Sequence, residues 1–180
     1  MANTETANKI PCATLTLTCI SLCHSCISID GEYKGISVDE VTLLEAVRKV
    51  KNFPYFVDRD SQTIEMSDKT KFTVLKVNDF TAERRAMSIV VKNQNTGKIY
   101  AFVKGAETAI YSMLGEGKNA ASLAIEIEKF SNRGLRTLVF AYKEISDMNE
   151  ELEAGLILLG ATAVEDLLQE DVASNISEYQ

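Results

Sequence analysis

The 180-residue sequence has no tryptophan, two prolines and one histidine, and its formal net charge is -7. This acidic balance argues against a general nucleic-acid surface, because such a surface is basic. The one histidine, His24, lies in an apolar stretch, so the sequence offers no nucleophile–base constellation. No paired carboxylates or metal-ligand spacings stand out either. The lack of these patterns favours a ligand-binding role over a catalytic one, and we expect neither catalytic nor metal-ligating residues in this chain.

Cysteine is confined to the first 26 residues, at Cys12, Cys19, Cys23 and Cys26. The spacing of Cys23 and Cys26 allows a zinc site, but no distant second pair of ligands completes a tetrahedron. Buried, reduced thiols are therefore the favoured interpretation, and they imply a reducing compartment.

Residues 10–29 carry no charge, which raises the alternatives of a membrane span or a signal peptide. About half of the stretch is serine, threonine, cysteine or histidine, too polar for a convincing span. A signal peptide would begin with basic residues, and residues 1–8 have none. The pattern favours a buried helix over Leu15–Ile27, with its hydroxyl groups bonded back to the helix backbone.

The remaining pattern predicts helices interleaved with a run of strands. Ser37 and Glu40 fit a capping box that starts a helix ending near Lys51, before Pro54. Further helices are expected at 107–114, 120–132 and 147–154, and strands at 55–58, 62–66, 71–78, 86–91, 99–103, 135–142 and 156–159. We therefore predict an α+β (mixed α/β) fold in one domain, with a mostly antiparallel twisted sheet flanked by helices.

The segment 79–107 is the centre of the functional interpretation. Its two apolar runs form a β-hairpin with Gly97 in the turn. The second strand ends in Lys104 and Gly105, just before a helix. We expect Gly105 to let a ligand approach the backbone and the helix start to favour an anion. The later stretch 114–119 is not a P-loop, because it lacks the first glycine and has Asn119 where a magnesium-binding hydroxyl belongs.

Four side chains indicate what is bound. Phe80 can stack on a base or fill the core, and Lys104 can reach a phosphate or extend its charge to solvent. Arg136 interrupts an apolar strand and needs an anion, either Glu107, another carboxylate, or a ligand phosphate. Glu40 can accept a hydrogen bond from an exocyclic amine or serve only as a cap. Together they make a purine-phosphate site plausible.

Five motifs carry a family resemblance over about residues 20–172. In chain order they are Tyr33–Glu40 (YKGISVDE), Asp79–Ser88 (DFTAERRAMS), Lys104–Glu107 (KGAE), Gly134–Leu138 (GLRTL) and Ile157–Asp166 (ILLGATAVED). The sequence resembles the nucleotide-binding (N) domain of P-type ATPases, specifically the phospholipid-flippase branch. The resemblance implies an ATP site formed by Glu40, Phe80, Arg85, Lys104, Arg136 and Thr137.

The resemblance also assigns roles to these residues. Adenine would stack on Phe80 with Glu40 near its amino group, Lys104 would lie at the deep end, and Arg136 with Thr137 would lie near the phosphates.

Three positions depart from the family pattern. Arg85 replaces the usual lysine, keeping the charge but not necessarily its geometry. Val38 replaces a proline, which loosens the loop before the helix. Ala82 replaces a frequent serine and removes a polar contact with the nucleotide.

The resemblance further implies a division of the chain. It makes residues 10–160 the nucleotide-binding domain and 161–180 a hinge toward a phosphorylation domain that the sequence does not contain. Residues 1–9 are polar, and we expect them to be disordered. The chain would hold ATP for phosphorylation of an aspartate elsewhere without hydrolysing it. Mg²⁺ would travel with the nucleotide and be bound mainly by the absent domain.

The implied setting is the cytosolic face of a membrane. There this soluble, monomeric fragment would work with the phosphorylation and actuator domains of one flippase polypeptide, with no nucleic-acid partner. Two alternatives stay open: the nucleotide-binding domain of a cation-transporting P-type ATPase, and a non-enzymatic protein-interaction module.

Overall fold

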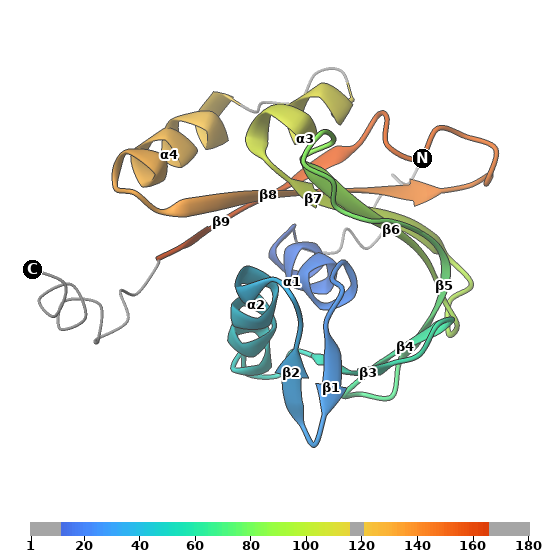
Figure 1. Ribbon diagram of the computed structural model, residues 1–180. Coiled ribbons are helices and arrows are strands. Elements are labelled where there is room, and N and C mark those ends of the chain that lie inside the picture. The colour runs from blue at the N-terminus through green and yellow to red at the C-terminus, as the bar shows by residue number, and fades with distance from the viewer. Residues whose placement is uncertain (1–11, 116–120, 166–180) are drawn as a thin grey trace, which may run out of the picture.

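A computed structural model describes residues 12–115 and 121–165, and within them the predicted α+β fold is confirmed (Figure 1). One antiparallel sheet has seven strands in chain order: β3 (Phe56–Arg59), β4 (Thr63–Met66), β5 (Lys71–Asn78), β6 (Ala86–Asn93), β7 (Ile99–Gly105), β8 (Arg136–Ile145) and β9 (Ile157–Val164). The expected disordered segment 1–9, most of the loop 114–119, and residues 166–180 of the expected hinge lie outside the described residues.

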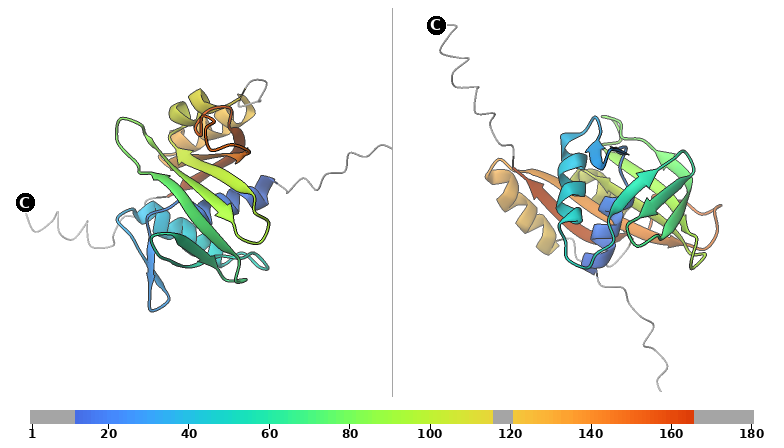
Figure 2. Two further views of the ribbon diagram at one scale, coloured as in Figure 1. Left: turned by 90° about the vertical axis from the view of Figure 1, so that its right-hand side faces the viewer. Right: turned by 90° about the horizontal axis from the view of Figure 1, so that it is seen from below.

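Helices cover both faces of this sheet. Figure 2 shows α1 (Cys12–Leu22) and α2 (Val38–Arg48) on one side, and α3 (Glu107–Met113) and α4 (Ala121–Asn132) on the other. Side chains alternate between the two faces of a strand. Phe102 accordingly packs in the cluster with α1 and α2, and the next residue, Val103, packs in the cluster with α3 and α4.

The predicted caps of two helices are in place. The Ser37 side chain accepts a hydrogen bond from the backbone N–H of Glu40 at the start of α2, 3.4 Å away. Helix α4 ends at Asn132 and is followed by Gly134, whose φ is +77°, and the N–H of Leu135 donates to the carbonyl of Phe130 at 3.1 Å. This is a Schellman ending, for which glycine is the favoured residue.

The first helix is shorter than predicted. Helix α1 ends at Leu22, and the chain then forms a two-stranded hairpin of β1 (Ile27–Ile29) and β2 (Glu32–Lys34). Asp30 and Gly31 both have positive φ in its turn, which matches the Asp-Gly preference of tight hairpins. The prediction of one continuous helix over this uncharged stretch is therefore wrong. The expected hydroxyl bonds are confirmed, since Thr16 and Thr18 donate to carbonyls four residues earlier.

The predicted acidic helix at 147–154 is also wrong. Strand β8 continues to Ile145, and turns then lead to β9. The Glu150 carboxylate accepts hydrogen bonds from the backbone N–H groups of Ser146 and Asp147, and the Asp147 carboxylate accepts one from Asn149. Such side-chain bonds to nearby backbone compete with helix formation. Strand β9 is longer than predicted and pairs with β8 as far as Val164.

Gly105 has a structural role different from the predicted one. It pairs with Ala86 on β6, and a Cβ atom at Gly105 would lie 2.5 Å from the carbonyl oxygen of Arg85 and 2.9 Å from the Ala86 Cβ. The group that approaches the Gly105 backbone closely is therefore the neighbouring chain segment, not a ligand.

A methyl group at this position is expected to destabilise the fold. Gly105→Ala should lower the free energy of unfolding by roughly 1–2 kcal/mol, because backbone rather than a flexible side chain must move. Urea denaturation followed by circular dichroism measures the change. Gly115→Ala is the control, since its Cβ would meet only contacts of 3.4 Å. Equal stabilities of the two variants would contradict this role of Gly105.

Candidate functional site

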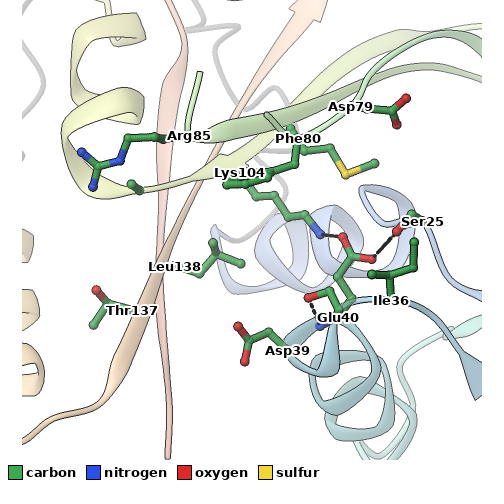
Figure 3. A pocket seen from close by; sticks show the side chains of 13 residues that line it. Ser25, Ile36, Asp39, Glu40, Asp79, Phe80, Arg85, Lys104, Thr137 and Leu138 are labelled. Atoms are coloured by element: carbon green, nitrogen blue, oxygen red, sulfur yellow. Dashed lines mark hydrogen bonds and ion pairs between the residues drawn. The ribbon is translucent and has the colours of Figure 1, made fainter. Parts of the chain in front are cut away.

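A cavity of about 670 Å³ opens where α2, the loop between β5 and β6, and the ends of β7 and β8 meet (Figure 3). It is lined by Ser25, Ile36, Ser37, Asp39, Glu40, Asp79, Phe80, Arg85, Met87, Lys104, Ala106, Thr137 and Leu138. The predicted residues Glu40, Phe80, Arg85, Lys104 and Thr137 are thus brought to one pocket. Arg136 lies beside this pocket and does not line it.

A buried ion pair forms the floor of the pocket. The Lys104 ammonium lies 2.5 Å from a carboxylate oxygen of Glu40, and the two side chains are only 8% and 9% exposed. The other Glu40 oxygen accepts hydrogen bonds from the backbone N–H and the hydroxyl of Ser25, at 3.0 and 2.8 Å. Burial alone would raise the pKa of Glu40, but the Lys104 charge and these donors hold it below its ordinary value.

From the sequence, Glu40 and Lys104 were each expected to contact a ligand, whereas in the structure they form an ion pair with each other. They are 64 positions apart in the chain, so no local pattern pointed to the pair. The alternative of Lys104 extending its charge to solvent is wrong, because the residue is buried. Glu40 has more than a capping role, because its carboxylate binds Lys104 and Ser25.

Three of the four thiols are buried close to this ion pair. Cys19, Cys23 and Cys26 are buried, as expected, while Cys12 is exposed, and none of the four is in a disulfide. Burial, together with the nearby Glu40 charge, raises the pKa of Cys26 to about 11, so the thiol is held in its neutral form.

Phe80 lies at the mouth of the pocket and not in the core. It is 62% exposed, in the loop that connects β5 to β6, so the alternative of a core phenylalanine is wrong. Ile36, which also lines the pocket, is 100% exposed. The mouth therefore presents an aromatic ring and an aliphatic side chain above a charged floor.

Arg85 lies on the side of the pocket away from the ion pair. Its side chain points away from Lys104 and Glu40 in Figure 3. Its backbone has φ of +52°, an unusual conformation for a residue with a Cβ atom. The Arg85 carbonyl accepts a hydrogen bond from the N–H of Ala106 at 2.9 Å, which ties the Phe80 loop to the end of β7.

Arg136 has a carboxylate partner within the protein. Its guanidinium lies 2.8 Å from Asp39 and is 48% exposed. Among the predicted alternatives, a protein carboxylate is therefore confirmed, and it is Asp39, not Glu107. Thr137 and Leu138, the next residues of β8, do line the pocket.

Sequence reasoning missed several lining residues. Met87 pairs with Lys104 across the β6–β7 ladder. The predicted hairpin did not fix this pairing, because strands that end at Val91 and begin again at Ile99 would have paired Lys104 with Ala86. Asp39, Ile36 and Met87 all lie in family motifs, but no residue pattern singled them out as lining a pocket.

Comparison with known proteins identifies relatives of this chain. A profile of the family "P-type ATPase, cytoplasmic domain N" matches residues 13–171. "Phospholipid-transporting ATPase FetA" of Mus musculus is 34% identical across 92% of this chain and 17% of its own length. "Phospholipid-transporting ATPase IC" of Homo sapiens is 34% identical across 88% of this chain and 15% of its own length.

A plant protein, "Phospholipid-transporting ATPase 2" of Arabidopsis thaliana, is 29% identical across 89% of this chain and 17% of its own length. The chain thus spans well under a fifth of the length of the curated relatives it matches. Over the ranges that the structure describes, no helix is long and apolar enough to cross a membrane.

Proposed function

Because the chain belongs to the cytoplasmic domain N family of the P-type ATPases, we propose that its pocket binds ATP and positions it for phosphate transfer to an aspartate in another domain of the same polypeptide. The observation that carries this proposal is the exposed Phe80 ring at the mouth of a pocket with the buried Lys104 at its floor. The domain contributes binding and orientation, which can supply a large share of an enzyme's rate enhancement.

The base would occupy the apolar mouth. Adenine stacks on the exposed face of Phe80, and Ile36 supplies aliphatic contact from the α2 side. Lys104 and Glu40 neutralise each other in the floor, so the floor has little net charge to attract a triphosphate. Arg85 therefore supplies most of the attraction for the phosphates, with the Thr137 hydroxyl as a donor. Arg136 adds positive charge at the edge of the pocket, where it is paired with Asp39. Mg²⁺ arrives with the nucleotide and is bound mainly by the phosphorylation domain.

The relatives indicate the kind of pump. They are phospholipid-transporting ATPases, so we assign this domain to a lipid-translocating pump on the cytosolic face of a membrane, working with phosphorylation and actuator domains. The cation-transporting alternative lacks comparable support among these relatives. Binding by the isolated domain should be weak, with Kd above about 0.1 mM, because no second domain closes over the phosphates.

Removing the aromatic ring should weaken ATP binding selectively. Phe80→Ala is expected to raise the Kd for ATP about tenfold, because base–aromatic stacking is worth about 1–3 kcal/mol. Backbone amide shifts measured during titration with ATP give both Kd values. Binding of inorganic triphosphate should be unchanged in the variant, because it has no base to stack.

Leu75→Ala is the matched control, since Leu75 is 41% exposed on β5 and does not line the pocket. If ATP induces no shifts around the pocket in the unchanged chain, the proposed function fails, and the alternative of an interaction module is the one left to test.

A further inference from the structure

The carboxylate of Glu153 is a junction of hydrogen bonds outside the pocket. One of its oxygens accepts from the Ser88 hydroxyl at 2.5 Å, the Arg84 guanidinium at 2.5 Å and the Asn78 amide at 3.0 Å. Asn78 also donates to the Ser88 hydroxyl at 2.9 Å. The Glu153 side chain is 23% exposed, so most of it is removed from water. We call Glu153, Ser88, Arg84 and Asn78 the Glu153 junction.

The three donors surround the loop that carries Phe80. Asn78 is the last residue of β5 and pairs directly with Ser88 of β6, and Arg84 lies in the loop between these strands. Arg84 also donates through its second terminal nitrogen to the carbonyl of Asp79 at 2.8 Å. One guanidinium therefore links Glu153 to the peptide unit that leads into Phe80.

Electrostatics favour the charged form of this junction. Burial alone would raise the pKa of Glu153, but the hydrogen bonds from Ser88, Asn78 and Arg84 outweigh it and hold the pKa below its ordinary value. A partly buried ion pair with additional donors is stronger and more directional than an exposed pair. The junction thus fixes the loop from a segment, between β8 and β9, that does not itself touch the pocket.

We propose that Glu153 is a positioning residue, which acts through Arg84 to hold the Phe80 ring at the pocket mouth in the orientation that accepts a base. The inference rests on the proposed ATP-binding function and extends it to a residue outside the pocket. A loop held in its binding conformation before the ligand arrives loses less conformational freedom on binding, so affinity increases.

The first test reports on the ring without any ligand. The chain has no tryptophan, so Phe80→Trp introduces a single tryptophan at the pocket mouth, which can be excited selectively over the six tyrosines. Adding Glu153→Gln should increase its quenching by acrylamide and shorten its anisotropy decay, because the loop gains freedom. Glu151→Gln is the matched control, an identical change at an exposed position two residues away. Arg84→Lys keeps the charge but cannot bridge Glu153 and Asp79, so it should behave like Glu153→Gln.

The second test measures nucleotide binding with Phe80 present or absent. Glu153→Gln should raise the Kd for ATP about threefold and leave that for inorganic triphosphate unchanged. In a Phe80→Ala background it should have no further effect on ATP, because the residue acts through the ring. If Glu153→Gln instead weakened ATP binding through a general loss of structure, it would raise the Kd for ATP in the Phe80→Ala background as well.

The outcomes separate this inference from the proposed function. If Glu153→Gln shows the same quenching and the same Kd for ATP as the Glu151→Gln control, the inference is overturned. It is also overturned if Glu153→Gln raises the Kd for ATP as much in the Phe80→Ala background as in the chain that has Phe80. If the unchanged chain binds no ATP, the proposed function fails, and the quenching experiment alone decides whether Glu153 holds the loop.

Discussion

Replacing Lys104 with methionine should lower the free energy of unfolding by about 3–5 kcal/mol at about pH 7.5, because it leaves a charged carboxylate buried without its counterion. Glu40 is 9% exposed and would keep only Ser25 and the Cys26 thiol as donors. Such a charge is strongly destabilising in a medium less polar than water. Urea denaturation of Lys104→Met and of the unchanged chain measures the difference.

Two further variants distinguish charge burial from lost packing. Adding Glu40→Gln to Lys104→Met should restore much of the lost stability, because no uncompensated charge then remains. Lys98→Met is the control, since the ion pair of Lys98 with Glu144 is 2.9 Å long but about half exposed, and such pairs contribute little. Equal losses for Lys104→Met and Lys98→Met would show that the buried pair does not stabilise the fold.

Acidification should destabilise the domain through its only histidine. His24 is 1% exposed, its Nδ1 accepts a hydrogen bond from the N–H of Cys26, and its other ring nitrogen lies 3.0 Å from the carbonyl of Ser21. This arrangement suits the neutral ring protonated on Nε2. Burial, with the charges of Arg59 and Lys104, lowers the pKa of His24 to about 3.

The sign of the effect follows from proton uptake on unfolding. The unfolded histidine has a pKa near 6.5, so below that pH the unfolded chain binds a proton that the folded chain excludes until about pH 3. The free energy of unfolding should therefore fall by about 3 kcal/mol between about pH 7.5 and 4.5.

Urea denaturation across this range measures the slope, and His24→Gln should flatten it between about pH 7 and 5, where no other side chain of ordinary pKa titrates. The slope is the readout, so a lower overall stability of His24→Gln does not matter. An unchanged slope in that variant would exclude His24 as the source of the pH dependence.

Local patterns predicted the parts of the fold that depend on neighbouring residues. The Ser37 cap, the Gly97 turn and the Gly134 helix ending each rest on contacts within a few positions, and all three are found. The helix predicted at 147–154 is absent because the Glu150 and Asp147 carboxylates accept hydrogen bonds from nearby backbone N–H groups in place of the helical carbonyls. Acidic, polar composition does not reveal that competition.

Most of the predicted site residues do line one pocket, but the network that joins them was not predictable. Residue type and position relative to strand ends identified Phe80 and Lys104. The partners of the charged groups come from distant segments: Glu40 for Lys104, and Glu153 for Arg84. Sequence periodicity carries no information about which carboxylate reaches which cation once the sheet is assembled.

Arg85 has a further consequence for the balance between stability and activity. Its positive φ is a conformation that glycine adopts freely and that costs other residues roughly 1–2 kcal/mol. The free energy of folding alone would favour glycine at position 85, yet the chain has an arginine there, at the wall of the pocket. Thermostability engineering that follows backbone preference would replace this arginine first, and would thereby remove a positive charge from the wall of the proposed ATP site.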